Sequence, residues 1–292
     1  TIITGSQQGK LEGYDLLVED GKIETCCDPA MGTGGFLIDY IEHILKESKS
    51  KNIHLDWDFI TTNGIYGKEI DSATYQLALS NMLIHSGHMF NDLDNGDSIR
   101  EPIIQKFDNI LSNPPFGIKG LKYNDFQYSL KSNYLPIKTD NAVSLFIQAI
   151  IYMLKINGKC AVVLPDGQDL FSKTNKTLIT IREYLLKTCD VKEIIYLPSH
   201  IFTFTTIKTC VFYFVKKKEG KDCLEIKSSV NKNNNENRKS NFTDGYSTNK
   251  VYWYEHGENK KLLVSASIEE IEEKDYSLDY NEYMKKEEKE IN

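Results

Sequence analysis

The stretch Asp28–Phe36 reads D-P-A-M-G-T-G-G-F and follows a short run of strand-forming residues, Ile23–Asp28. Pro29 halts that strand, and three glycines within four positions allow a tight turn whose backbone can approach a ligand closely. The next segment, Phe36–Lys46, carries apolar residues at helical spacing. A strand, a glycine-rich turn and a helix in this order predict the first unit of an open α/β sheet, with a ligand outside the strand end.

Further strands and helices alternate along the chain. We predict strands at Gly64–Ile70, Phe107–Leu111, Lys159–Leu164, Val191–Leu197 and Thr209–Val215, and helices at Leu77–Ile84, Ser144–Lys155 and Leu178–Lys187. Strands separated by helices favour right-handed βαβ units. Only Pro198–Lys208 joins the last two strands, so we expect them to be antiparallel neighbours. The predicted fold is α/β: a doubly wound, mostly parallel Rossmann-like sheet with an antiparallel final strand and helices on both faces.

Acidic residues stand where the sugar and base of a nucleoside cofactor would lie. Asp28 is placed to accept hydrogen bonds from an ammonium or hydroxyl group, and Glu69, in G-K-E-I-D, ends the second strand where a carboxylate can bind both ribose hydroxyls. Asp97, in N-G-D-S, is a candidate for contact with a cofactor adenine. The alternatives are a solvated charge at a helix N-terminus for Glu69 and a plain turn residue for Asp97. The glycine turn matches neither the dinucleotide fingerprint nor the P-loop.

The segment Asn113–Gly117 (N-P-P-F-G) follows the strand predicted at Phe107–Leu111. Two prolines fix φ and donate no N–H, so this rigid turn offers acceptors, namely the Asn113 side-chain oxygen and the Pro114 carbonyl. Two acceptors that converge on an exocyclic amino group bind both of its hydrogens, which leaves the nitrogen lone pair free to attack a sulfonium methyl group. Phe116 offers a planar base an apolar face for stacking. A purely structural Asn-Pro turn is the alternative.

These motifs together resemble the amino-group methyltransferases of the class I Rossmann-like family, and within it the modification (M) subunits of type I restriction–modification systems. The quoted segments match the first cofactor motif, the second (G-K-E-I-D with L-A-L-S-N-M-L-I-H) and the catalytic motif in order. The tail segment I-E-E-I-E-E-K-D-Y-S-L is similar to the C-terminal E-E-I-x-x-x-D-Y-N-L segment of the family. Family members also carry an N-terminal helical domain and an aromatic-Thr-Pro segment before the first strand, and residues 1–22 contain neither.

The resemblance implies a DNA adenine methyltransferase that uses S-adenosylmethionine and flips its target base out of the duplex. It also implies DNA, a specificity (S) subunit and a restriction (R) subunit as partners. We predict two sets of site residues: Asn113, Pro114, Pro115 and Phe116 as catalytic, and Asp28, Pro29, Ala30, Gly32, Thr33, Gly34, Gly35, Glu69 and Asp97 as cofactor-binding. The alternatives are a catalytically idle, cofactor-binding scaffold, and a methyltransferase for an RNA base or a protein glutamine.

Composition and charge complete the prediction. The net charge of −7 is uneven: residues 1–150 sum to −8, residues 151–250 to +7 and residues 251–292 to −6. The basic middle section could contact phosphates, while the overall balance suggests that a partner supplies much of any DNA affinity. Six scattered cysteines form no zinc-binding pattern, and no apolar run is long enough to span a membrane. We therefore expect a cytoplasmic protein with reduced thiols and no metal site.

We expect four segments along the chain. Residues 1–22 are an N-terminal remnant, and residues 23–215 are the S-adenosylmethionine-dependent methyltransferase catalytic domain. Residues 216–250 are a polar, Lys/Asn-rich insertion or linker. Residues 251–292 are an acidic helical tail, with its helical pattern at Ser265–Tyr283, and we expect this tail to contact a partner.

Overall fold

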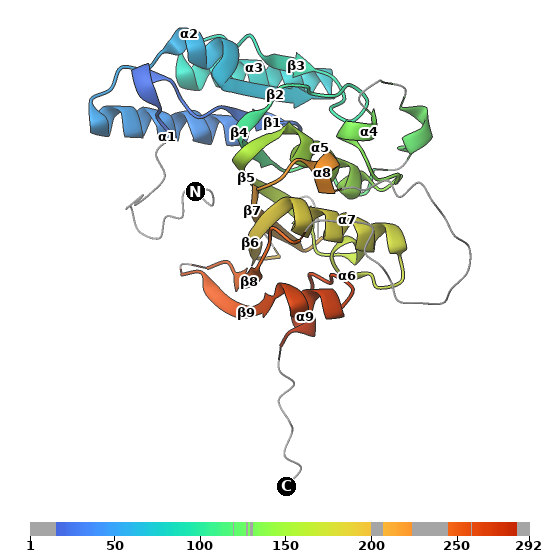
Figure 1. Ribbon diagram of the computed structural model, residues 1–292. Helices are drawn as coiled ribbons and strands as arrows, with labels where there is room; N and C mark the ends of the chain where they lie inside the picture. Colours follow the sequence, from blue (N-terminus) through green and yellow to red (C-terminus); the bar gives the residue numbers. More distant parts are fainter. Residues whose placement is uncertain are drawn as a thin grey trace.

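A computed structural model describes residues 16–118, 120–126, 128, 131–199, 207–223, 245–257 and 259–284. Within these residues one sheet of nine strands runs through the molecule in the order β3-β2-β1-β4-β5-β7-β6-β8-β9 (Figure 1). The strands are β1 (Cys26–Asp28), β2 (Ile65–Glu69), β3 (Leu93–Asn95), β4 (Phe107–Ser112), β5 (Leu154–Pro165), β6 (Cys189–Tyr196), β7 (Thr209–Lys216), β8 (Lys250–Glu255) and β9 (Lys261–Ser267).

Strand direction matches the expectation from the sequence. Strands β3, β2, β1, β4 and β5 are mutually parallel, and β7 lies antiparallel between β5 and β6. The predicted antiparallel pairing of β6 with β7 is therefore confirmed. The three-residue strand β3 was not predicted, because so short a segment shows no periodicity.

Helices cover both faces of the sheet, as predicted. The longer ones are α1 (Gly35–Lys51), α3 (Ser72–Ser86), α5 (Ala142–Met153) and α7 (Lys176–Thr188), and the shorter ones are α2 (Trp57–Phe59), α4 (Lys131–Tyr134), α6 (Gln168–Phe171), α8 (Gly220–Cys223) and α9 (Ile268–Glu273). Short helical turns occur at η1 (Glu19–Gly21), η2 (Ile60–Gly64), η3 (Tyr123–Asp125) and η4 (Tyr280–Glu282). No helix in the described part of the chain is long and apolar enough to cross a membrane.

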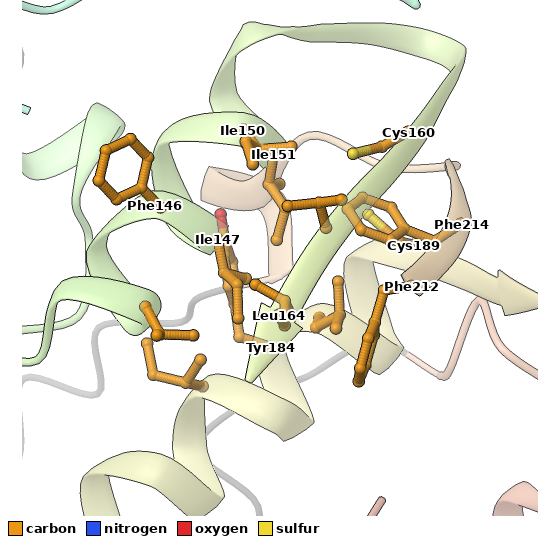
Figure 2. Close-up of a cluster of buried hydrophobic side chains, with 14 of the residues drawn as sticks. Phe146, Ile147, Ile150, Ile151, Cys160, Leu164, Tyr184, Cys189, Phe212 and Phe214 are labelled. Carbon is orange, nitrogen blue, oxygen red and sulfur yellow. The ribbon is translucent and has the colours of Figure 1, made fainter. Parts of the chain in front are cut away.

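Adjacent residues of β1 pack on opposite faces of the sheet. Cys26 packs in the cluster that contains α1 and α3 residues, whereas Cys27 packs in the larger cluster that contains α5 and α7 residues. This alternation is the two-residue period of a strand buried on both faces. Figure 2 shows part of the larger cluster, which contains Ile147 and Ile150 of α5 together with Phe212 and Phe214 of β7.

The C-terminal region differs from the expected acidic helical tail. Residues Lys250–Glu255 and Lys261–Ser267 form a hairpin, β8 and β9, which joins the sheet through parallel pairing of β8 with β6. Only Ile268–Glu273 is helical, behind a capping box in which Ser267 and Glu270 bond each other's backbone N–H. The helical part of the prediction was therefore wrong over β8 and β9.

Part of the segment that follows α9 is buried in the domain, and the expected contact of residues 251–292 with a partner stays a prediction. Ser277 and Leu278 are almost fully buried, and the Trp253 indole N–H of β8 donates to the carbonyl of Leu278 at 2.9 Å. The predicted insertion or linker, residues 216–250, lies mostly outside the described residues, which resume at residue 245. Its first residue, Lys216, belongs to β7 and is fully buried.

Replacing Trp253 by Ala tests whether the C-terminal hairpin belongs to the core. Trp253 is fully buried and stacks on Tyr283 at 5.0 Å, so Trp253→Ala should lower the free energy of unfolding by about 3–5 kcal/mol. The neighbouring Tyr252 is 37% exposed, and Tyr252→Ala should cost less than about 1 kcal/mol. Urea denaturation measures both values. Equal, small losses would mean that the hairpin is not part of the cooperative core.

Candidate active site

The glycine-rich turn connects β1 to α1 in left-handed backbone conformations. Gly32 has φ of 55° and Gly34 has φ of 87°, a region that side-chain-bearing residues rarely adopt. Gly34 is the N-cap of α1 and supplies no side-chain cap, so the helix begins on bare backbone. The N–H of Met31 donates to the carbonyl of Lys68 at 3.0 Å, which fixes the turn to β2. The sequence therefore forms the turn that it predicted.

The Asp28 side chain connects the ends of β1 and β4 next to this turn. Its carboxyl oxygen Oδ1 accepts from the N–H of Ala30 at 3.0 Å and from the hydroxyl of Ser112, the last residue of β4, at 2.9 Å. The side chain is 1% exposed, and burial raises the pKa of this carboxyl to about 7, against the lowering effect of the two hydrogen bonds. The nearby charge of Glu69 adds to the rise. Through these two hydrogen bonds, Asp28 fixes the glycine-rich turn to the end of β4.

Glu69 bridges the turn and the start of α3. One carboxylate oxygen accepts from the N–H of Gly32 at 3.0 Å, and the other accepts from the N–H of Asp71 at 2.9 Å. Asp71 in turn caps α3. Each carboxylate oxygen has two lone pairs, so Glu69 keeps acceptor capacity for a ligand after both of these bonds.

Asp97 lies in the loop after β3, where its carboxylate is already engaged. Oδ1 accepts from the N–H groups of Ile99 and Arg100, and Oδ2 accepts from the Arg100 guanidinium at 2.6 Å. Behind the loop, the ammonium of Lys68 lies 3.1 Å from a carboxylate oxygen of Glu101. A ligand that donates to Asp97 must therefore compete with Arg100.

The Asn113–Phe116 turn leaves β4 beside the glycine-rich turn. The side-chain oxygen Oδ1 of Asn113 is buried and has no hydrogen-bond partner within the described residues. A buried acceptor without a donor costs about 1–3 kcal/mol, so such atoms are rare. The Phe116 ring is half-buried and packs against a small apolar cluster that contains Ala161 and Val163 of β5.

A cavity of about 280 Å³ joins these elements. It brings together most of the predicted cofactor residues and two of the four predicted catalytic residues. From the predicted set, its lining contains Pro29, Ala30, Gly32, Glu69, Asp97, Asn113 and Pro115. The other predicted site residues, Asp28, Thr33, Gly34, Gly35, Pro114 and Phe116, lie around it and are not part of the lining.

Sequence reasoning missed much of the cavity wall. Lys68, Ile70 and Gly96 are direct neighbours of predicted residues, and the flanks of the two acidic motifs could have indicated them. Phe146 of α5 carried no such signal, because it belongs to an apolar helix predicted only as core. The wall residues that were not predicted are Lys68, Ile70, Gly96, Ser98, Ile99, Arg100, Ile118, Leu121 and Phe146.

The sheet is mostly parallel, with a glycine turn after β1, an acidic residue at the end of β2 and an Asn-Pro-Pro-Phe turn after β4. This is the fold and the order of motifs of the Rossmann-like methyltransferase class. The family model described as N-6 DNA Methylase matches residues 15–291. This chain belongs to the N-6 DNA methylase family.

Several relatives are methylase subunits of type I restriction enzymes. The chain is 32% identical over 204 residues to the EcoEI methylase subunit of Escherichia coli, which covers 68% of this chain and 39% of that protein. It is 26% identical over 284 residues to the MpnII methylase subunit of Mycoplasma pneumoniae, which covers 91% of this chain and 49% of that protein. The chain thus spans less than half the length of these relatives.

A solved structure supports the same fold. The crystal structure of the type I restriction enzyme EcoKI M protein superposes with a TM-score of 0.60 at 26% identity, over 80% of this chain and 44% of that chain. The predicted fold class and family are therefore confirmed.

Replacing Asp28 by Asn tests the pKa of the buried carboxyl. Because the folded pKa of about 7 exceeds the ordinary 3.8, the folded protein keeps a proton that the unfolded chain releases. Stability therefore falls as pH rises between about 4 and 7, by up to about 1.4 kcal/mol per pH unit from this group. Asp28→Asn should remove that contribution in urea denaturation across this range.

A matched control for this experiment is Asp71→Asn at the N-cap of α3. Hydrogen bonds from Thr74 hold the pKa of the exposed Asp71 carboxyl below its ordinary value of 3.8, so its contribution to stability is lost only below about pH 4, and Asp71→Asn should leave the slope between about pH 4 and 7 unchanged. An unchanged slope for Asp28→Asn would contradict the raised pKa.

Proposed function

We propose that the chain transfers a methyl group from S-adenosylmethionine to the exocyclic N6 amino group of a flipped adenine in DNA, as the modification subunit of a restriction–modification system. The observation that carries this proposal is the unsatisfied Asn113 oxygen at the wall of the cavity. An amino group is the donor that such an acceptor lacks.

The residues of the cavity fit the proposed cofactor. S-adenosylmethionine supplies a methyl group on a positively charged sulfur, and the wall carries Glu69 and Asp97, whose carboxylates suit a cationic ligand with hydroxyl and amino donors. Gly32 leaves its backbone open, since a Cβ there would meet no atom within 4 Å. Apolar side chains, among them Ile70 and Ile99, face the same space and suit a purine ring.

Asn113 and Pro114 would activate the target amine. The Asn113 side-chain oxygen and the Pro114 carbonyl accept its two hydrogens, which draws the nitrogen lone pair out of conjugation with the ring and directs it at the methyl group. The nitrogen would gain the methyl group as the bond between that group and sulfur breaks, and the cationic amine would then release its proton to water, so no strong general base is required. The prolines hold the acceptors in place before the substrate arrives, which lowers the cost of reorganisation.

DNA as the substrate, and the partner subunits, rest on the family and its relatives. Adenine within a duplex is stacked, so it must leave the helix to reach a pocket walled by Pro115 and bordered by Phe116. We propose that a specificity subunit reads the DNA sequence and that a restriction subunit performs cleavage. The chain is acidic overall, with a net charge of −7, which agrees with a partner that supplies DNA affinity.

Methyl transfer tests the proposal directly. Labelled S-adenosylmethionine is incubated with unmethylated DNA and the chain, with and without a specificity subunit, and label in N6-methyladenine is measured. We expect incorporation with the partner present. Cofactor binding without incorporation in either case would favour an idle scaffold, and label in RNA or protein alone would assign another substrate.

Asn113→Ala separates catalysis from cofactor binding. It should lower turnover at least about 100-fold, because it removes an acceptor aimed at the reacting nitrogen. The dissociation constant for S-adenosylmethionine, measured by calorimetry, should stay within about twofold, since Glu69 and Gly32 are unchanged. Glu69→Ala is the matched control and should weaken cofactor binding. Equal losses of binding in both variants would show that the assignment of the two subsites is wrong.

A further inference from the structure

The structure contains a buried arginine that the proposed chemistry does not use. Arg182 lies in the middle of α7 and is 3% exposed. Burial lowers the pKa of its guanidinium to about 10, which still leaves it charged at neutral pH. A charge at such a site must be compensated by hydrogen bonds.

Arg182 donates to four main-chain carbonyl oxygens from two distant segments. Nη1 donates to Asp169 at 3.1 Å and Nη2 to Ser172 at 2.6 Å, in the segment that follows β5. Nε donates to Tyr276 at 2.7 Å and Nη2 also to Asp275 at 3.1 Å, nearly a hundred residues further along the chain. The planar guanidinium fork suits several fixed acceptors at once.

The C-terminal acceptors are held in an uncommon conformation. Asp275 and Tyr276 are consecutive residues with φ of 55° and 56°, a left-handed region that residues other than glycine adopt at a cost. Directly after them, the N–H of Leu278 donates to the carbonyl of Leu170 at 2.7 Å. Arg182 and Leu278 thus bind the same short stretch, Asp166–Ser172, from two sides.

That stretch leaves the sheet at the same edge as the proposed target-base site. Strands β4 and β5 are adjacent and parallel, with Ser112 opposite Val162, so the Asn113–Phe116 turn leaves the sheet beside the last residues of β5, and the Asp166–Ser172 segment begins where β5 ends at Pro165. The Phe116 ring packs in the cluster that contains Val163. A base stacked on Phe116 would therefore lie beside the end of β5, from which this segment departs.

We infer that Arg182 is a positioning residue, which acts through the Asp166–Ser172 segment to shape the side of the target-base site next to β5. This inference rests on the proposed function. The proposed cofactor residues Gly32, Glu69 and Asp97 lie at or just after the ends of β1, β2 and β3, which lie on the other side of β4 from β5 and its following segment. Loss of Arg182 should therefore affect use of the methyl acceptor and leave cofactor binding unchanged.

Two substitutions of buried cations test the inference. Arg182→Met should lower the rate of methyl transfer to DNA about 10- to 100-fold, as expected when a misplaced wall disturbs the reacting geometry. The matched control is Lys216→Met: Lys216 is also fully buried, and it donates to the carbonyl of Leu154 at the opposite end of β5. Both variants should lower the melting temperature, but only Arg182→Met should lower the transfer rate. Affinity for S-adenosylmethionine should stay within about twofold in both.

Arg182→Lys keeps the charge and part of the hydrogen bonding, so its transfer rate should fall between those of Arg182→Met and the unmodified protein. If Arg182→Met fails to fold, the transfer rate of Arg182→Lys alone tests the inference. Equal rate losses in Arg182→Met and Lys216→Met, or a parallel loss of cofactor affinity, would reduce Arg182 to a structural role and overturn the inference.

Hydrogen exchange separates this inference from the proposed function, because it requires no methyl transfer. Amide exchange in Asp166–Ser172 should become faster in Arg182→Lys and stay unchanged in Lys216→Met. Unchanged exchange in Arg182→Lys would overturn the inference even if the protein methylates DNA. Faster exchange, together with no transfer by the unmodified protein, would instead count against the proposed function.

Discussion

The candidate site depends on a hydrogen-bonded carboxyl group at the point where parallel strands end together. Asp28 of β1 accepts from the N–H of Ala30 and from the hydroxyl of Ser112, so one side chain fixes both the glycine-rich turn and the start of the Asn-Pro-Pro-Phe turn. The carboxyl ends of parallel strands lie at one edge of a sheet. The hydrogen bonds of Asp28 fix the position of the two loops relative to each other at that edge. The pKa of Asp28 is raised because burial disfavours the charged form of its carboxyl group.

Several polar groups at this edge are satisfied within the protein, and the exceptions decide what the site can bind. Both oxygens of Glu69 accept backbone N–H groups, and the Asp97 carboxylate is bound by Arg100. The Asn113 oxygen has no such partner. Lack of a partner does not by itself mark a site: Asn109 Oδ1 is also unsatisfied, yet it lies inside the sheet next to Tyr40. Asn113 differs because it is one of the residues that line the cavity, together with the acidic residues Glu69 and Asp97 and the backbone of Gly32.

The sequence predicted most of the strands, the helices and the glycine turn because these depend on local periodicity and on residues close in the chain. The prediction from sequence failed for features that depend on contacts between residues far apart in the chain. The role of Asp28 depends on Ser112, 84 residues away, and Phe146 joins the cavity wall only because α5 packs there. Strand β8 lies almost entirely within residues 251–292, which we predicted as an acidic helical tail because of their composition and the helical spacing at Ser265–Tyr283. Its inward residues, Val251 and Trp253, have partners only after folding. The assignment of the site residues to their chemical roles stays a prediction.

Burial of the C-terminal segment changes what the shared tail motif can mean. A D-Y-S-L stretch on a solvent-facing helix would suit contact with another subunit, but here Ser277 and Leu278 are enclosed and Asp275 and Tyr276 adopt left-handed conformations. Such strain persists only where the surrounding contacts determine the conformation. Because Arg182 supplies those contacts and also holds the segment after β5, the C-terminal segment and the sheet edge that carries the candidate site are directly connected.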